Sequence, residues 1–238
     1  GLTIAKTKKR KGLNLNVGCG NYILDGFKSL DFYSKNYYPN KEKFLKERIE
    51  YDIINQSIPF DSLTVDNIYC SHVIEHLENL HVTRFFEESF RVLKNSGVLR
   101  IVCPDSRFFY DICSFENEFL NFHLEEEYKN GKNNWKYFVE ETANHKLNKK
   151  DYDLNKSIES YSYEDLLKEL NTGAKFDPNK VETHINAWDY NRIKQIGGRI
   201  GFRKIINSKP GGSVSKELQG PDIDVFLKEI SLFVDLVK

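Results

Sequence analysis

The sequence of 238 residues contains no methionine and carries no net charge. Gly1 stands where an initiator methionine would be, which is typical of a cleaved tag. Missing methionines would shorten some spacings by one residue, so no interpretation rests on a single-residue offset. Lys and Arg together number 35, as do Asp and Glu, and this balance disfavours a general nucleic-acid binder. The basic run of Lys6, Lys8, Lys9, Arg10 and Lys11 is typical of a solvated tail, with a phosphate-contacting arm as the alternative.

Paired cysteines and long apolar runs are also absent. Cys19, Cys70, Cys103 and Cys113 form no CxxC pair, and three of them lie in or beside apolar strand-like runs. We therefore expect buried, reduced thiols in a cytoplasmic protein. No apolar stretch approaches the roughly 20 residues that span a bilayer, and no secretory signal is evident. We expect no membrane association and leave the oligomeric state open.

Apolar segments alternate with helical patterns along most of the chain, as in a mostly parallel sheet with crossover helices. A hydrophobic fraction of 39% and a length of 238 residues suit one well-buried domain over residues 1–238. The sequence thus predicts an α/β, doubly wound, Rossmann-like fold with helices on both faces. Strands are expected at 13–17, 27–32, 48–52, 65–70, 98–102, 202–206 and 230–237, and helices at 80–93 and 188–196.

Residues 107–180 break this alternation, because many aromatic side chains are interleaved there with charges. The segment is too long for an ordinary connection and too aromatic for a disordered linker. We interpret it as a mostly helical insertion that forms a lid over the strand ends. Its aromatic residues either build the lid's own core, which is favoured, or stack on a flat acceptor or sugar. Trp135 and Trp188 are the first candidates for stacking.

The most informative stretch is the apolar run 13–17 followed by Gly18-Cys19-Gly20. A buried strand that enters Gly-x-Gly makes a tight turn where the backbone can approach a ligand closely. The dinucleotide fingerprint needs a third glycine three residues later, where this sequence has Ile23. The pattern therefore favours a nucleotide-type ligand other than NAD, with a ligand-free turn as the alternative.

Two carboxylates stand at the ends of the next two predicted strands. Asp31 could accept hydrogen bonds from both hydroxyls of a ribose. Asp52 could accept from an adenine amino group, while Ile53 and Ile54 supply an apolar face for the ring. Each carboxylate could instead cap a turn. Asp31 also follows Gly20 too closely for an ordinary crossover helix, so at most a stub of helix is expected between them.

Taken in order, these motifs resemble the class I S-adenosylmethionine-dependent methyltransferases, particularly their small bacterial, type 11-like members. The resemblance covers residues 13–105 and rests on NVGCG at 16–20, SLD at 29–31, VDNIYCSHVIEHL at 65–77 and RVLKNSGVLRI at 91–101. It implies a seven-stranded sheet whose last strand is antiparallel, and S-adenosylmethionine as the cofactor. The implied cofactor contacts are Gly18, Cys19, Gly20, Asp31, Phe32, Asp52, Ile53 and Ser71.

Methyl transfer needs mainly an acceptor aligned with the methyl carbon, and a base helps where the acceptor loses a proton. His72 and His184 are the candidates, because imidazole titrates near neutral pH. Either could instead have a structural role. The spacing of His72, Glu75 and His76 would also allow a divalent ion on one helical face. A hydrogen-bonded loop anchor is favoured there, and no metal is expected.

The predicted function is methyl transfer to a small-molecule or glycan-type acceptor, on oxygen or nitrogen. Two alternatives from other classes remain open. One is a nicotinamide-dependent oxidoreductase, disfavoured by Ile23 and by the Glu75-His76 segment. The other is a non-catalytic binding module that keeps the fold, disfavoured by the presence of Gly18, Gly20 and Asp31.

Overall fold

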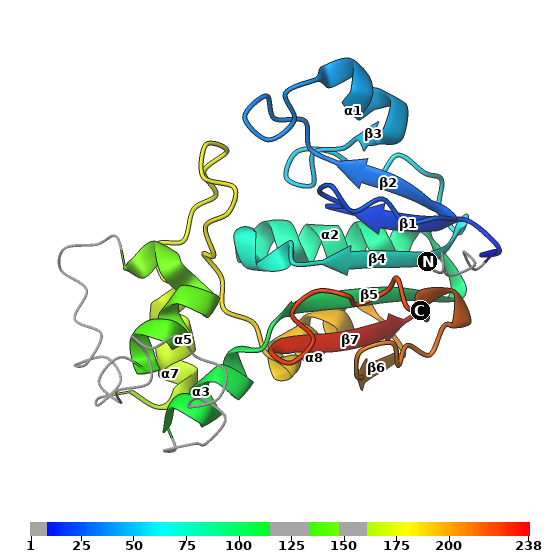
Figure 1. The fold of residues 1–238 in the computed structure, drawn as a ribbon. Coiled ribbons are helices and arrows are strands. Elements are labelled where there is room, and N and C mark those ends of the chain that lie inside the picture. Colours follow the sequence, from blue (N-terminus) through cyan, green and yellow to red (C-terminus); the bar gives the residue numbers. More distant parts are fainter. Residues whose placement is uncertain (1–8, 115–133, 148–160) are drawn as a thin grey trace, which may run out of the picture.

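A seven-stranded sheet forms the centre of the protein in a computed structural model, which describes residues 9–114, 134–147 and 161–238 (Figure 1). The strand order is β3-β2-β1-β4-β5-β7-β6. Neighbours from β3 to β5 are parallel, whereas β7 is antiparallel to both β5 and β6. This confirms the predicted fold class. The strands are β1 Asn14–Val17, β2 Phe27–Asp31, β3 Ile49–Glu50, β4 Val65–Ser71, β5 Leu93–Pro104, β6 Lys204–Asn207 and β7 Ser231–Val237.

Six α-helices are described, and three of them gather at the end of the sheet toward which β4 points (Figure 1). These three, α3, α5 and α7, are the α-helices in the described part of the 107–180 insertion. Phe109, Phe138 and Leu166 pack together in its interior, so these aromatic rings build a local core. None of the described helices is both long and apolar enough to cross a membrane. The helices are α1 Lys41–Glu47, α2 Asn79–Val92, α3 Ser106–Ser114, α5 Asn134–Ala143, α7 Tyr163–Asn171 and α8 Tyr190–Ile200, with 3-10 turns η1 Ile74–His76, η2 Asn144–Lys146 and η3 Lys216–Leu218.

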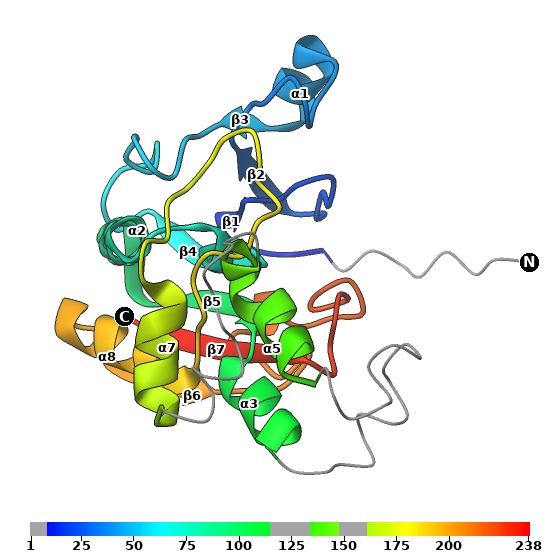
Figure 2. The same cartoon turned by 90° about the vertical axis from the view of Figure 1, so that its left-hand side faces the viewer.

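Alternate residues of the central strands pack on opposite faces of the sheet, as the period of two requires. Ile68 and Leu99 join the larger core, on the face that α2 and α8 cover (Figure 2). Tyr69 and Phe233 point to the other face, where the segment around η3 covers them. Helices on both faces were expected, but in the described chain this second face is covered mainly by the loops and short turn of residues 208–230.

The end of α8 and the β1–β2 connection differ from the sequence prediction. The helix was expected to stop at Gly197, but it continues to Ile200 and ends at Gly201, whose φ is +113°. Gly197 instead allows close packing, because a Cβ there would lie 2.5 Å from Cδ2 of Leu236. No helix, not even a stub, lies between β1 and β2 in this fully described stretch.

Arg10 belongs to the core rather than to a solvated basic tail. Its guanidinium donates to both carboxylate oxygens of Asp222, each at 2.8 Å, and stacks over Phe27. It also donates to the carbonyl oxygens of Asp25 and Glu217. The tail prediction is therefore wrong at this position, because a planar guanidinium can satisfy several acceptors at once.

A second buried charge lies in the middle of the sheet. Arg100 on β5 donates to Asp224, with Nη2 and Oδ2 2.5 Å apart, and to Asp235 on β7, with Nη1 and Oδ1 2.7 Å apart. All three side chains are fully buried. Since β5 and β7 pair directly at Arg100 and Asp235, this charge network joins neighbouring strands.

Glu88 on α2 provides a test of stability against pH. Its carboxylate accepts from Arg91 and from the Ile58 backbone at 2.9 Å, which pins the loop before β4 to the helix. The hydrogen bond from Arg91 lowers the pKa of Glu88. We expect Glu88→Gln to lower the free energy of unfolding by about 1 kcal/mol at pH 7. Urea unfolding at a series of pH values measures this difference.

The difference should disappear as the pH falls through the lowered pKa of the folded protein. A depressed carboxyl pKa contributes stability above the unfolded value, and that stability is lost when the folded carboxylate takes up a proton. Glu87→Gln, at the neighbouring exposed position, serves as the control and should leave stability nearly unchanged. A gap between wild type and Glu88→Gln that stays constant down to acid pH would contradict the prediction.

Candidate functional site

The glycine turn after β1 and the carboxylate at the end of β2 meet at one edge of the sheet. Because β1 and β2 are parallel neighbours, their carboxyl ends lie side by side. The Gly18 N–H donates to the Leu30 carbonyl at 2.8 Å, and the Gly20 N–H donates to Asp31 Oδ2 at 2.6 Å. The glycine turn and Asp31, both proposed from the sequence as ligand contacts, therefore lie side by side.

The first glycine of the turn is crowded by a neighbouring side chain, whereas the second borders open space. Gly18 has φ +66°, and a Cβ there would lie 2.3 Å from Cγ2 of Val73, so only glycine fits. Gly20 has φ +52°, but a Cβ on it would meet nothing within 4 Å. The turn therefore presents backbone toward open space beside Asp31. An open space thus borders the turn at the sheet edge where ligands of open α/β folds bind.

Two residues that sequence reasoning missed complete the surroundings of Asp31. The Tyr38 hydroxyl donates to Asp31 Oδ2 at 2.8 Å. Arg48 donates to the Gly20 carbonyl at 3.1 Å and stacks over the Tyr38 ring. Burial and the Asp31 charge raise the pKa of Tyr38, so its hydroxyl remains a donor. Neither residue lies in a recognisable motif, and α1, whose Phe44 ring packs against both the Tyr38 ring and the Arg48 guanidinium, was not predicted.

Cys19 and Phe32 flank this contact. Burial, and then the Asp31 charge, raise the pKa of the Cys19 thiol to about 12, so it stays protonated at neutral pH. The Phe32 N–H donates to Asp31 Oδ1 at 2.7 Å, which fixes the carboxylate in place. The Cys19 side chain is thus an uncharged, buried thiol that packs beside Asp31.

Asp52 caps the turn that follows β3. Its Oδ1 accepts from the Ile54 N–H at 2.9 Å and its Oδ2 accepts from the Asn55 side chain at 2.8 Å. Ile53 and Ile54 are partly buried against the main core. Asp52 therefore caps a turn, which was the alternative interpretation. A hydrogen bond from adenine would have to be accepted by an oxygen that already has a partner within the turn.

His72 lies just beyond β4, next to Ser71, and has a backbone φ of +54°. Its Nδ1 is 3.1 Å from Glu75 Oε1, and its Nε2 is 3.2 Å from Ser231 Oγ. Burial disfavours the protonated ring, but the hydrogen bond and charge of Glu75 outweigh that effect and raise the pKa of His72. The ring is thus held by a carboxylate on one side and a hydroxyl on the other.

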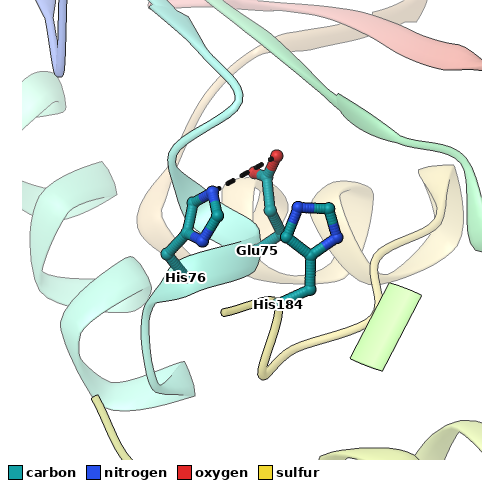
Figure 3. Close-up of side chains that lie close together, drawn as sticks. All are labelled: Glu75, His76 and His184. Carbon is teal, nitrogen blue, oxygen red and sulfur yellow. Dashed lines mark ion pairs between the residues drawn. The ribbon is translucent and has the colours of Figure 1, made fainter. Parts of the chain in front are cut away.

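His184 approaches the same carboxylate from a distant part of the chain. One ligand-type atom each of Glu75, His76 and His184 lies within 4.8 Å of the other two (Figure 3). The sequence grouped His72, Glu75 and His76 on one helical face, but only residues 74–76 are helical, as a 3-10 turn, and His72 precedes it with its Nδ1 3.1 Å from Glu75 Oε1. Local spacing could not indicate His184 as the third member.

Trp188 has no access to an acceptor. It is 1% exposed, its indole N–H donates to the Ile74 carbonyl at 3.0 Å, and Arg192 stacks on its ring. The stacking hypothesis is therefore wrong for Trp188, while the side chain of Trp135 lies outside what the structure describes. A groove of about 1060 Å³ lies between α7 and α8, but none of the predicted site residues lines it.

Known proteins give one family match. A family model described as a methyltransferase domain matches residues 15–101, the segment from β1 into β5 that holds the glycine turn, Asp31 and His72. No curated protein matches this chain.

Among solved structures, the chain is similar to the PH0226 protein of Pyrococcus horikoshii OT3, with 25% identity over 44% of this chain and 55% of that one, and a TM-score of 0.36. It thus spans about half the length of that protein. It is also similar to a SAM-dependent methyltransferase of Archaeoglobus fulgidus, with 14% identity over 95% of this chain and 86% of that one, and a TM-score of 0.46. A third similar structure is a SAM-dependent methyltransferase of Aquifex aeolicus, with 13% identity over 95% of this chain and 81% of that one, and a TM-score of 0.42.

Proposed function

We propose, on the methyltransferase-domain model that matches residues 15–101, that this chain is a class I S-adenosylmethionine-dependent methyltransferase and that it methylates an oxygen or nitrogen atom of a small-molecule or glycan-type acceptor. Its cofactor is S-adenosylmethionine. One observation carries the proposed site: the Gly20 N–H and Asp31 Oδ2 lie 2.6 Å apart at the carboxyl ends of β1 and β2. Ligands of open α/β sheets bind at this edge.

The residues around the glycine turn would hold the cofactor. Gly18, Cys19 and Gly20 would wrap the methionine and ribose portions, while Asp31 accepts hydrogen bonds from the ribose hydroxyls. Phe32 would lie beside the adenine, with Ile53 and Asp52 at its far side. When bound, the cofactor would supply a methyl group attached to a sulfonium sulfur. The sulfur is the leaving group, because it becomes a neutral thioether once the methyl group is transferred.

His72 would act as the general base, with Ser71 beside the reacting centre. Its Nδ1 faces the Glu75 carboxylate, so the neutral ring carries its proton there and leaves a lone pair on Nε2. That lone pair can take the proton that an acceptor hydroxyl or amine loses. The Ser231 hydroxyl oxygen lies 3.2 Å from Nε2, so a hydroxyl of the acceptor in a similar position would be within hydrogen-bond distance of the base. His184 is the second candidate, with one ring nitrogen within 4.8 Å of a Glu75 carboxylate oxygen.

The lid of residues 107–180 would cover the acceptor. Support comes from α3, which begins at Ser106 directly after β5, at the sheet edge where β4 ends. The lid's described helices share a core of their own, so it can close over the site as one unit.

Calorimetry and a turnover assay test the proposed function together. S-adenosylhomocysteine should bind with one site per chain, whereas NAD should not bind. Turnover is measured as S-adenosylhomocysteine released in the presence of sugars, simple alcohols and amines. We expect His72→Asn to lower kcat by about 10²–10⁴-fold and to leave the affinity for S-adenosylhomocysteine unchanged.

His81→Asn is the matched control, because His81 lies on α2 outside the site, and it should keep both properties. NAD binding in place of S-adenosylhomocysteine would favour the oxidoreductase. Binding of neither would favour a non-catalytic module. An unchanged kcat in His72→Asn would remove the assigned base.

A further inference from the structure

Glu75, His76 and His184 form a compact, largely enclosed cluster between two segments of the chain (Figure 3). Glu75 and His76 come from η1, just after β4, and His184 comes from the stretch that returns from the lid toward α8. In Figure 3 the three side chains point toward one another from these two segments. The cluster shares Glu75 with His72, whose Nδ1 lies 3.1 Å from Glu75 Oε1.

Both imidazoles are oriented so that one ring nitrogen faces the cluster. His76 Nδ1 lies 3.1 Å from the Thr183 carbonyl oxygen, and His184 Nδ1 lies 2.6 Å from the Glu141 carbonyl oxygen. A carbonyl can only accept, so each Nδ1 carries the hydrogen and each Nε2 keeps a lone pair. Metal-binding histidines are commonly fixed in this way by a hydrogen bond from the other nitrogen.

The carboxylate supplies the second, independent observation. Glu75 is 1% exposed, and its Oε2 has no hydrogen-bond partner among the described residues. Its Oε1 is already used by His72, at 3.1 Å, and lies 3.9 Å from His76 Nε2. A buried carboxylate oxygen without a partner is costly, and a bound cation would satisfy it.

The backbone holds the two segments together independently of these side chains. The N–H groups of Ile185 and Asn186 both donate to the Glu75 carbonyl, at 2.8 and 3.1 Å. The ligand atoms therefore come from two segments that backbone hydrogen bonds already hold side by side. Preorganisation of this kind lowers the entropic cost of binding.

We propose that Glu75, His76 and His184 bind a divalent transition-metal ion of the zinc class. Two imidazole nitrogens and one carboxylate oxygen are a ligand set that suits zinc and its borderline-soft neighbours rather than magnesium or calcium. Three protein ligands leave at least one coordination position for water or another oxygen. The site was not expected from sequence, because the pairing of η1 with His184 is non-local. The inference does not rest on the proposed methyl transfer.

Zinc titration of the full chain, free of any histidine tag and stripped with a chelator, tests the site. Calorimetry should show one zinc ion bound per chain by the wild type. We expect His76→Gln and His184→Gln each to weaken zinc binding by at least about tenfold, since altered support of a metal ligand alone costs about 10–100-fold. His81→Gln, in the same protein but outside the cluster, should bind zinc as the wild type does.

Cobalt provides a readout that does not depend on affinity. Co²⁺ added to the wild type should give visible absorption bands of an imidazole-ligated ion, and the double variant His76→Gln/His184→Gln should lack them. Circular dichroism shows whether the double variant is folded. If it is not, the zinc titrations of the two single variants test the proposal instead. Zinc binding equal in the wild type and in folded variants, or weakened equally by His81→Gln, would overturn the proposal. Methyl transfer could be present or absent in either case.

Discussion

Replacing Arg100 by methionine should lower the free energy of unfolding by about 3–5 kcal/mol at neutral pH, because it strands two carboxylates inside the sheet. Asp224 and Asp235 are fully buried, and Arg100 is the cation that each of them contacts. Without the guanidinium, each must either stay charged in a poorly polarisable interior or take up a proton on folding. Guanidinium chloride unfolding of the two proteins measures the loss.

Removing the stranded charges should restore part of that stability. The Asp224 carboxylate also accepts from the Gly211 N–H, and Asp235 accepts from the Val214 N–H, so asparagine keeps those acceptors while removing the charge. The triple variant Arg100→Met/Asp224→Asn/Asp235→Asn is therefore expected to be more stable than Arg100→Met alone. Arg199→Met, at an exposed position of α8, should change stability by less than about 0.5 kcal/mol. A loss below about 1 kcal/mol in Arg100→Met would show that the network contributes little.

Asp31→Ala should weaken the binding of S-adenosylhomocysteine by about 5–150-fold, which corresponds to about 1–3 kcal/mol. The carboxylate is the acceptor that the ribose hydroxyls would use, and an alanine offers them none. It also organises the turn, because Oδ2 accepts from the Gly20 N–H and from Tyr38. Calorimetry with S-adenosylhomocysteine measures the change, and thermal unfolding shows whether the variant remains folded.

Two further variants separate the ribose contact from the local support. Tyr38→Phe removes only one hydroxyl from Asp31, so it should weaken binding less than Asp31→Ala does. Asp25→Ala changes an exposed carboxylate in the same connection between β1 and β2 and should leave the affinity as it is. An Asp31→Ala protein that binds as tightly as the wild type would place the ribose elsewhere.

The fold was predictable because its signals are local. Strands buried on both faces appear as short apolar runs bounded by turns, and β1, β2, β4 and β7 were found within a residue or two of their ends. The end of α8 was not predictable in this way. Gly197 suggested the end of the helix, yet it lies inside α8, where only glycine is small enough to pack against Leu236. That contact exists only in the assembled sheet.

The candidate site divides along the same line. Gly18, Gly20 and Asp31 belong to adjacent strands of one parallel unit, so sequence order alone brings them together. Tyr38 reaches Asp31 through the unpredicted helix α1, and His184 reaches Glu75 through the return of the chain from the lid. Such contacts depend on tertiary packing, which periodicity and spacing do not encode.

The position of β7 has a consequence for how the protein is made. It is the last of the described strands in sequence order, yet it lies between β5 and β6, and among the described strands β6 pairs with β7 alone. A ribosome-bound nascent chain therefore exposes the apolar margin of β5 until synthesis reaches residue 231, and β6 has nothing to join until then. The sheet can close only once residues 231–237 have left the ribosome, and until then aggregation or chaperone capture competes with its folding.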